Sequence, residues 1–559
     1  MQQTRFSRLR NICFTLILAA TFSNANAQQA GVATAHPLAT EAAQQILNLG
    51  GNAFDAAVAA TATLAVVEPA GSGLGGGGFW LLHRAEDGFE TMLDGREMAP
   101  GKAHRDMYLD ADGNVIPKLS INGPLAAGIP GVPAALAYLA ENYGNLELSQ
   151  SLTPAIRHAR QGFALDAHAQ RLLKFRHKAI LASPAAAEVF LVDGEIPPIG
   201  HSIIQTDLAN TLEMIAATNA KGFYQGEFAN QLASGVKSAG GIWEVEDLSN
   251  YKLLEREPIR TEYRGMTITS AAPPSSGGIA LATMLNILEG YDLEGIASAQ
   301  RKHLIIEAMR RAYRDRAQYL GDPDFVKIPQ ERLTNKIYAS GLRSGIHPKK
   351  ATPSELLPTS VNHPSEGTDT THFSIVDRNG NRVAATLSIN FPYGSGFMVP
   401  GTGILLNDEM DDFSSKPGIA NVYGLVGAEA NAIEAGKRPL SSMSPTFIED
   451  DKNIVVLGTP GGSRIITMVL LGILEYADDG YADSITKLGR YHHQFLPDKV
   501  VYEKDALSEE EIAELKKRGH TLEQHSRTFG NMQVVIVDKN SETVSASSDP
   551  RRGGEASVK

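Results

Sequence analysis

Thr370, at the head of the segment 370–377, carries a hydroxyl that could act as a nucleophile. A threonine hydroxyl is a poor nucleophile unless a base lies within hydrogen-bond reach, and the chain's own freed α-amino group, with a pKa of about 7.7–8.0, can be that base. Thr370 gains such a group only when the chain is cut between Asp369 and Thr370. The sequence therefore raises the hypothesis of a threonine nucleophile that is completed by cleavage of the chain.

Two segments with the composition of strands would have to position this hydroxyl. Residues 371–376 and 383–389 are rich in Val, Ile, Thr and Phe, which are enriched in β-strands. The segment between them contains Asn379-Gly380, and an Asn-Gly pair is a strong hairpin signal. We therefore predict an antiparallel hairpin that begins at Thr370. An ordinary surface hairpin with scattered hydroxyls has the same local pattern, so the assignment depends on the rest of the chain.

The hairpin register decides which side chains lie beside Thr370. A turn centred on the Asn-Gly pair places Thr370 opposite Ile389, and a one-residue bulge would move it opposite Ser388 or Asn390. In each of these registers, Ser388 and Asn390 lie next to Thr370. We therefore expect a second hydroxyl and an amide beside the candidate nucleophile.

The first 27 residues have the pattern of a secretory signal peptide. Three arginines precede an apolar run at 12–20, which is too short for a membrane span, and the small residues at 25–27 offer a cleavage site. Cleavage there would remove three of the 51 basic side chains and none of the 63 acidic ones. The acidic balance argues against nucleic acid or an anionic membrane as a partner. We expect an exported protein, in a bacterial periplasm or, alternatively, secreted.

The single cysteine, Cys13, lies within this predicted signal peptide. The mature protein would therefore have no thiol nucleophile, no disulfide and no thiolate-bound metal. The histidines show no ligand spacing and no Gly-x-Ser-x-Gly elbow is present, so neither a metal site nor a Ser-His-Asp hydrolase has support from the sequence.

Helices dominate the predicted elements before Thr370, and strands those after it. Helices are predicted at 40–49, at 52–67 with Asn52 and Asp55 together as cap, at 301–320, and from Ser508 with Glu511 in a capping box. Strand pairs are predicted at 447–448 with 453–457 and at 531–537 with 543–547. This order favours an α+β fold of packed layers over an alternating doubly wound sheet.

A basic run lies within the helix predicted at 301–320. Apolar residues such as Leu304 and Ala308 occupy one face of this helix, and Arg310, Arg311 and Arg314 lie elsewhere on it. The simplest interpretation of the three arginines is a face that is exposed to solvent.

Two glycine clusters have different interpretations. The cluster at 73–78 matches a dinucleotide-binding pattern formally, but it follows a predicted helix and precedes the strand-like segment 79–82, the reverse of the required order. We interpret it as a tight turn that packs close to another backbone. Gly461 and Gly462 instead follow a strand and lead into the apolar run at 465–474, a corner whose N–H groups can bind a developing oxyanion.

The chain resembles the γ-glutamyltranspeptidase family over essentially its whole mature length. The resemblance rests on these motifs: Asp94 to Pro100, Pro273 to Gly278, Tyr319 to Asp324, Thr370 to His372, Asn407 to Phe413, Arg438 to Pro445, and Pro460 to Ser463. It implies a four-layer αββα sandwich of the N-terminal nucleophile hydrolase type. It also implies self-cleavage into a large subunit, 28–369, and a small subunit, 370–559, which stay associated as one composite domain.

The resemblance further implies a reaction and the residues that carry it out. Thr370 would attack the γ-carbonyl of glutathione, glutamine or a related donor, and water or the amine of an amino acid or dipeptide would resolve the ester. In this scheme Ser388 is a second hydroxyl beside Thr370, and Gly461 and Gly462 form the oxyanion hole. The donor α-carboxylate is bound by Arg96 with Ser441 and Ser442, and the α-ammonium by Asn390, Glu409 and Asp412. The segment 417–437, which carries Tyr423, forms a lid. No cofactor and no metal are implied.

Two alternatives remain beside this interpretation. The related glutaryl-cephalosporin acylases share the Thr-Thr-His start, but a glutaryl group has no ammonium to pair with both Glu409 and Asp412, so the sequence favours a transpeptidase or γ-glutamyl hydrolase. An exported binding protein for amino acids or peptides could use Arg96 and Asp412 without doing chemistry. Such a protein would remain one chain.

Overall fold

The computed structural model describes residues 29–357, 370–416, 418, 421, 424–425 and 427–559. The predicted signal peptide, the residues that directly precede Thr370, and Tyr423 lie outside these ranges. Within them the chain forms a mixed α and β structure. None of the helices in the described ranges is long and apolar enough to cross a membrane.

The first large sheet has seven strands, all paired antiparallel. In spatial order these are β18 (Glu555–Val558), β1 (Gly31–Thr34), β9 (Thr371–Val376), β10 (Arg382–Ser388), β2 (Gly77–Arg84), β3 (Phe89–Gly95) and β6 (Leu254–Arg256). Strands from before and after Thr370 therefore belong to one sheet, and β9, which follows Thr370 directly, lies inside it.

The second large sheet has six strands. In spatial order these are β17 (Val544–Ser548), β16 (Gln533–Asp538), β12 (Asn453–Gly458), β11 (Thr446–Glu449), β8 (Met266–Ser270) and β7 (Ile259–Tyr263). The two strand pairs predicted in this part of the sequence, β11 with β12 and β16 with β17, are confirmed. Smaller sheets join β4 (Phe163–Ala164) to β5 (Ser202–Ile203), and β13 (Tyr491–His492), β14 (Val500–Tyr502) and β15 (Leu522–Gln524) to one another.

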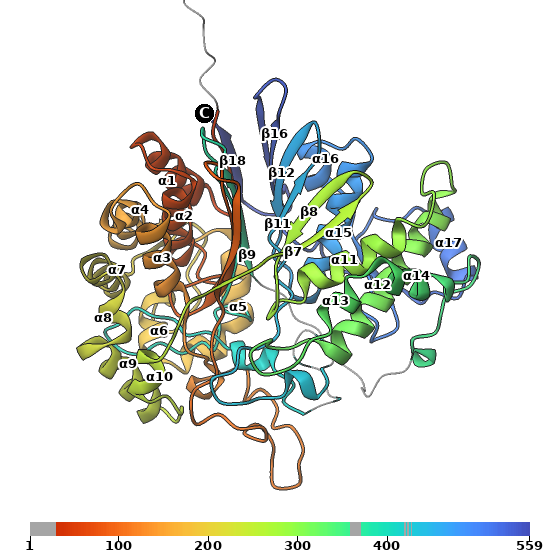
Figure 1. Cartoon of the computed structure of the whole chain (residues 1–559). Coiled ribbons are helices and arrows are strands. Elements are labelled where there is room, and N and C mark those ends of the chain that lie inside the picture. The colour runs from red at the N-terminus through yellow and green to blue at the C-terminus, as the bar shows by residue number, and fades with distance from the viewer. Residues whose placement is uncertain (1–28, 358–369, 417, 419–420, 422–423, 426) are drawn as a thin grey trace, which may run out of the picture.

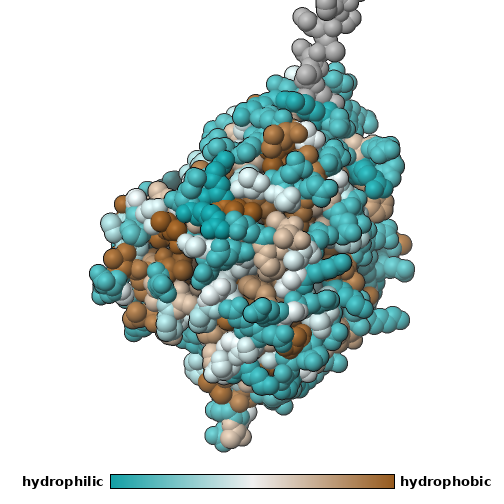
Figure 2. All heavy atoms as spheres, turned by 90° about the vertical axis from the view of Figure 1, so that its left-hand side faces the viewer, coloured by the Kyte–Doolittle hydropathy of each residue, from teal (hydrophilic) through white to brown (hydrophobic). Residues whose placement is uncertain are grey.

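Helices lie on both outer sides of the two sheets (Figure 1). On the left of the view are α1 (Pro37–Asn48), α2 (Ala53–Val67), α3 (Val132–Asn142), α4 (Leu148–Gln161), α5 (Ala167–Leu181), α6 (Pro184–Phe190), α7 (Thr206–Thr218), α8 (Lys221–Tyr224), α9 (Gly226–Ser238) and α10 (Val245–Ser249). On the right are α11 (Gly277–Leu288), α12 (Ser298–Tyr319), α13 (Gln330–Leu333), α14 (Lys336–Ser344), α15 (Ile465–Ala477), α16 (Ala482–Lys487) and α17 (Glu509–Lys517). The left-hand helices present a surface on which apolar side chains are interspersed with polar ones (Figure 2).

The two faces of the seven-stranded sheet belong to different hydrophobic cores. Val32 and Phe373 point into a core shared with α2 and its neighbours, whereas Ala33 and Phe79 point into a core shared with the second sheet, α11 and α15. This is the alternation that the two-residue period of a strand dictates. The second core ties the segments before and after Thr370 together, because both supply strands and helices to it.

The hairpin register differs from the predicted one by one residue. Thr371 pairs with Leu387, so the same register continued by one residue places Ser388, and not Ile389, opposite Thr370. The cause is a three-residue loop: the Asp377 N–H donates to the Asn381 carbonyl at 3.0 Å, and Gly380 adopts a φ of 87°. The placement of Ile389 was therefore wrong, and of the alternative registers the one with Ser388 is correct.

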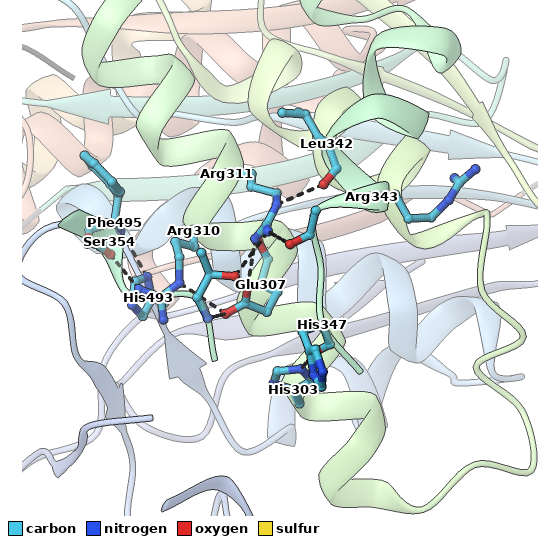
Figure 3. Close-up of polar contacts among 12 residues, drawn as sticks. His303, Glu307, Arg310, Arg311, Leu342, Arg343, His347, Ser354, His493 and Phe495 are labelled. Atoms are coloured by element: carbon cyan, nitrogen blue, oxygen red, sulfur yellow. Dashed lines mark hydrogen bonds and ion pairs between the residues drawn. The ribbon is translucent and has the colours of Figure 1, made fainter. Parts of the chain in front are cut away.

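The basic run of α12 is buried at Arg310 and Arg311 and half-buried at Arg314, which contradicts its predicted exposure. Arg310 and Arg311 are 1% and 2% exposed, and both pair with Glu307 one turn earlier on the same helix, at 3.2 and 2.7 Å (Figure 3). Backbone carbonyls at Leu342 and Gly345 accept further hydrogen bonds from Arg311. The predicted exposure was wrong because the segment that contains Leu342 and Gly345 packs over the helix. The same segment continues toward Thr370.

Replacing Glu307 should destabilise the protein strongly. Glu307→Gln removes the carboxylate that two buried guanidinium groups share, and breaking a buried ion pair in this way costs about 3–5 kcal/mol. The measurement is the midpoint of urea unfolding. The control is Glu514→Gln, which breaks the exposed pair with Lys517 and should cost at most about 1 kcal/mol. Equal midpoints for the two variants would contradict a stabilising role for Glu307.

Candidate active site

One recess brings together nearly all of the side chains proposed from the sequence. It is lined by Arg96, Thr370, Ser388, Asn390, Glu409, Asp412, Leu425, Ser441, Ser442, Met443, Gly462, Ser463 and Ile465. Of the predicted site residues that the structure describes, only Gly461 is missing from the lining. The free volume is about 20 Å³, room for one water molecule. A larger ligand must therefore displace contacts within the recess.

The end of the recess that contains Thr370 is formed by the ends of the central hairpin. Thr370 is 3% exposed and Ser388 is 4% exposed. The backbone N–H of Asn390 donates to Ser388 Oγ at 2.8 Å, and the Asn390 side-chain amide donates to the Asp408 carbonyl at 2.9 Å. Asn390 has a φ of 70°, a left-handed conformation that Asn tolerates better than most residues. This turn fixes Ser388 and Asn390 beside Thr370, as expected.

The glycine cluster at 73–78 lets two backbones meet behind this hairpin end. A Cβ atom on Gly76 would lie 2.1 Å from the Ser388 carbonyl oxygen, and one on Gly75 would lie 2.2 Å from the Leu405 carbonyl oxygen. Any other residue would force the strands apart. The interpretation of the cluster as a tight turn against another backbone is confirmed, and its effect is to hold Ser388 in place.

Glu68, which was not selected from the sequence, also contacts this end of the site. The Thr371 hydroxyl donates to the Glu68 carboxylate at 2.5 Å, and Glu68 follows directly after α2. Its only local signal is the Glu68-Pro69 pair that ends the helix. Glu68 therefore orients the residue next to Thr370 from a segment 303 positions away.

The opposite end of the recess is a cluster of charges around Arg96. Its guanidinium group contacts a Glu409 oxygen through Nη1 and lies 2.5 Å from Asp412 Oδ2 through Nη2, and a third carboxylate, Glu97, lies at 3.5 Å. Arg96, Glu97 and Glu409 are at most 1% exposed. Three carboxylates thus surround one guanidinium group, and the cluster has an excess of negative charge when all are ionised.

Burial and mutual repulsion shift the pKa values of these groups. Burial raises the pKa of Glu409 to about 7, with repulsion from Asp412 adding to the effect and Arg96 opposing it. Burial likewise raises the pKa of Asp412 and of Glu97. Burial disfavours the charge on Arg96, but attraction to Glu409 and Asp412 outweighs it and raises the pKa of Arg96. A cationic group of a ligand would relieve the repulsion among the carboxylates, and an anionic group of the same ligand could pair with Arg96.

The two serines of the recess are held by backbone and arginine contacts. Ser441 Oγ accepts from the Met443 N–H at 3.1 Å, and the Ser441 carbonyl accepts from Ser276. Arg316 donates to Ser442 Oγ at 3.2 Å. These bonds leave both hydroxyls with defined positions next to Arg96, where a carboxylate of a ligand could accept from them.

The glycine corner after β12 forms the wall on the other side of Thr370. Gly461 and Gly462 have φ values of 143° and 56°, and a Cβ atom on Gly461 would lie 2.5 Å from Met468 Cε. The predicted passage from strand through glycines into a helix is confirmed, because β12 ends at Gly458 and α15 begins at Ile465. Gly462 and Ser463 line the recess.

His372 points into the sheets and away from this chemistry. It is fully buried, its Nδ1 lies 2.8 Å from Thr386 Oγ1, and its Nε2 lies 3.2 Å from Ser374 Oγ. Burial lowers the pKa of His372 to about 3, so the ring is neutral. A structural role accounts for it.

The segment predicted as a lid reaches the recess through two described residues. Asn421 donates to Asp412 Oδ1 at 3.1 Å, and Leu425 is part of the lining. Tyr423, the residue selected from the sequence, lies outside the described residues. The neighbours of Tyr423 thus contact the charged end of the site.

Comparisons with known proteins show the family to which this chain belongs. Residues 39–559 match the family model described as gamma-glutamyltranspeptidase. The glutathione hydrolase proenzyme of Escherichia coli is 43% identical over 535 residues, 95% of this chain and 92% of its own, and that of a Pseudomonas species is 46% identical over 88% and 86%. The crystal structure of cephalosporin acylase from Bacillus halodurans superposes with a TM-score of 0.83 at 27% identity, over 100% of this chain and 98% of its own.

Proposed function

Because the chain belongs to the γ-glutamyltranspeptidase family, we propose that Thr370 is the nucleophile of a self-processing glutathione hydrolase and γ-glutamyltransferase. The observation that carries the proposal is the recess in which Thr370 and Ser388 lie at one end and Arg96, Glu409 and Asp412 at the other. The two hydroxyls can carry out acyl transfer, and the three charged side chains can bind an amino acid zwitterion.

We propose that maturation produces two subunits that stay together. The large subunit would be 28–369 and the small subunit 370–559, after removal of the signal peptide 1–27. Both parts supply strands to both large sheets, which supports their remaining one composite domain after the cut. The arrangement of two sheets between two groups of helices supports a four-layer αββα sandwich of the N-terminal nucleophile hydrolase type.

In the cleavage step, the Thr370 hydroxyl would attack the carbonyl carbon of the preceding peptide bond. The peptide C–N bond breaks, the nitrogen takes up a proton, and the acyl group rests on the Thr370 oxygen as an ester. Water then hydrolyses that ester, which releases residue 369 as a carboxylate and leaves Thr370 with a free α-amine and a free hydroxyl.

In the catalytic step, the α-amine of Thr370 would accept the proton of the Thr370 hydroxyl as the oxygen attacks the donor's γ-carbonyl. Ser388 would support the nucleophile with a second hydroxyl, and the N–H groups at Gly461 and Gly462 would stabilise the oxyanion. The amine of the donor leaves with a proton. The γ-glutamyl ester is then resolved by water, or by the amine of an amino acid or dipeptide acceptor.

The charged end of the recess would hold the donor by both of its α-groups. Arg96 offers a planar pair of donors to the α-carboxylate, helped by Ser441 and Ser442. Glu409 and Asp412 would give up their contacts with Arg96 and take the α-ammonium, together with Asn390. Exchange of ion pairs in this way explains how a donor enters a recess with little free space.

Donor recognition should depend on pH through Glu409. Because the pKa of Glu409 is raised to about 7, its carboxylate is mostly neutral at pH 6 and mostly ionised at pH 8, and only the ionised form attracts an α-ammonium. The inhibition constant of L-glutamate against a γ-glutamyl anilide donor should therefore fall by about tenfold from pH 6 to pH 8. Glutarate, which lacks the ammonium, should show no such fall. A parallel fall for both inhibitors would contradict the role of Glu409.

The test of the proposed activity is incubation of the purified protein with glutathione. Release of glutamate and cysteinylglycine is expected, and added glycylglycine should divert part of the γ-glutamyl group into a tripeptide. A protein that binds glutathione but leaves it intact would instead support the binding-protein alternative.

For localisation we propose the periplasm, with secretion as the alternative, because of the pattern of residues 1–27.

A further inference from the structure

A second and larger cavity lies directly beside the recess. Its volume is about 620 Å³, within the range that holds small peptides and other ligands of that size. The two cavities are walled by the same two loops. Asn390 and Ser463 line the recess, whereas their chain neighbours Phe391 and Arg464 line the large cavity. A donor whose γ-carbonyl sits at Thr370 therefore has this cavity next to it for the part beyond the bond that breaks.

The lining of the large cavity is rich in positive charge. It includes five arginines, Arg171, Arg464, Arg527, Arg551 and Arg552, and none of the described residues that line it is an Asp or a Glu. Three of the five already have partners: Arg551 pairs with Glu503 and Asp549, and Arg464 and Arg552 have contacts of their own.

Arg171 and Arg527 are exposed, and neither forms an ion pair with any carboxylate in the described part of the chain. Among the described residues, Arg171 bonds to the ring of His168. Burial and the nearby Arg552 and Arg171 lower the pKa of His168 to about 3. That ring is therefore neutral and does not compensate the arginine. Two guanidinium groups, from helix α5 and from the segment after β15, thus face the same cavity with their charge uncompensated.

Aromatic side chains complete the cavity. Phe175 and Phe391 pack with their ring centres 5.5 Å apart, and Arg464 lies over the Phe529 ring at 5.0 Å. Phe175 is nonetheless 65% exposed. Rings of this kind give apolar contact area to the stem of a bound side chain while the arginines bind its charged end.

From this cavity we infer a donor preference: the enzyme favours γ-glutamyl donors whose leaving group carries several carboxylates, and Arg171 and Arg527 bind that leaving group. The inference rests on the proposed function, because it takes Thr370 as the place where the bond breaks. The same residues would bind an acidic peptide that enters as the acceptor amine, since the acceptor takes the place that the leaving group vacates.

The test compares two donors that differ only in charge. The donors are γ-glutamyl-glutamyl-glutamate and γ-glutamyl-glutaminyl-glutamine, and the measured quantity is the ratio of their kcat/KM values. We expect the acidic donor to be preferred by about tenfold at low salt, and the preference to shrink at high ionic strength. In the double variant Arg171→Gln with Arg527→Gln, the ratio should fall to about one.

A matched control uses Arg378→Gln. Arg378 is an exposed arginine in the loop between β9 and β10, outside both cavities, and it should leave the donor ratio unchanged. A ratio near one in the unmodified enzyme would overturn the inference, as would a preference that survives in the double variant. If the unmodified enzyme processes neither peptide but hydrolyses glutathione, the inference also fails. Loss of all three activities would instead refute the proposed function itself.

Discussion

Thr370→Ala should leave the protein as one uncut chain and reduce glutathione hydrolysis by about four to six orders of magnitude, the loss seen when an enzyme loses its nucleophile. Alanine has no hydroxyl to attack the preceding peptide bond, so no α-amine is released and no γ-glutamyl ester can form. Both losses follow from one atom. The measurements are gel mobility of the purified protein and release of glutamate from glutathione.

Thr370→Ser is the control for this experiment. It retains the hydroxyl and loses one methyl group, so cleavage and hydrolysis should both remain measurable, although slower. A Thr370→Ala protein that is cut and fully active would contradict the mechanism. A Thr370→Ser protein without any cleavage would show that the methyl group, and not only the hydroxyl, is needed at this buried position.

Arg96→Lys should weaken donor binding, with an increase in KM of about 10- to 100-fold. Lysine keeps one positive charge but cannot offer two parallel N–H donors to a carboxylate, and a hydrogen bond to a charged group is worth about 1.5–3 kcal/mol. The turnover number should change much less than KM, because Arg96 lies at the charged end of the recess and not among the atoms that react. Steady-state kinetics with glutathione separate the two quantities.

The same substitution should also be compared with Arg84→Lys, an exposed arginine that pairs with Asp87 on the surface. This control makes the same replacement of a guanidinium group by an ammonium group, but at a site that contacts no donor. Its KM should therefore equal that of the unmodified enzyme. An unchanged KM in Arg96→Lys would remove Arg96 from donor binding and leave its ion pairs with Glu409 and Asp412 as purely structural contacts.

The central hairpin shows how far local sequence signals reach. The strand composition and the Asn-Gly pair were sufficient to predict β9, β10 and the position of Thr370 at their start. They did not determine the register, because the loop length depends on whether Asp377 closes the turn on Asn381, and a three-residue loop with Gly380 in a left-handed conformation competes closely with a two-residue turn. This difference of one residue places Ser388, and not Ile389, opposite Thr370.

The charged residues show a different limit. The motifs selected Arg96, Glu409 and Asp412, which lie together in one recess, but their direct contact with one another depends on the packing of segments more than 300 positions apart. The prediction of exposure for Arg310 and Arg311 was wrong because a later segment covers them, and the position of that segment is visible only in three dimensions. Their partner Glu307 lies one turn earlier on the same helix. Helical spacing alone cannot distinguish a solvated basic face from a buried ion-pair cluster.

Glu68, Arg171 and Arg527 carry no motif at all. Each acquires its place only because α2, α5 and the segment after β15 converge around the ends of the central hairpin. Residues that only orient or extend a site have no fixed spacing in the sequence. Different side chains at different positions could serve the same purpose, which is not true of the residues that react.

Intact mass combined with N-terminal sequencing of the purified mature protein shows whether the chain is cut before Thr370. We expect two chains in equal amounts, one of which begins Thr370-Thr371-His372. A single chain that runs through Thr370 in a preparation that hydrolyses glutathione would contradict the proposed mechanism, because the α-amine that serves as its base would not exist.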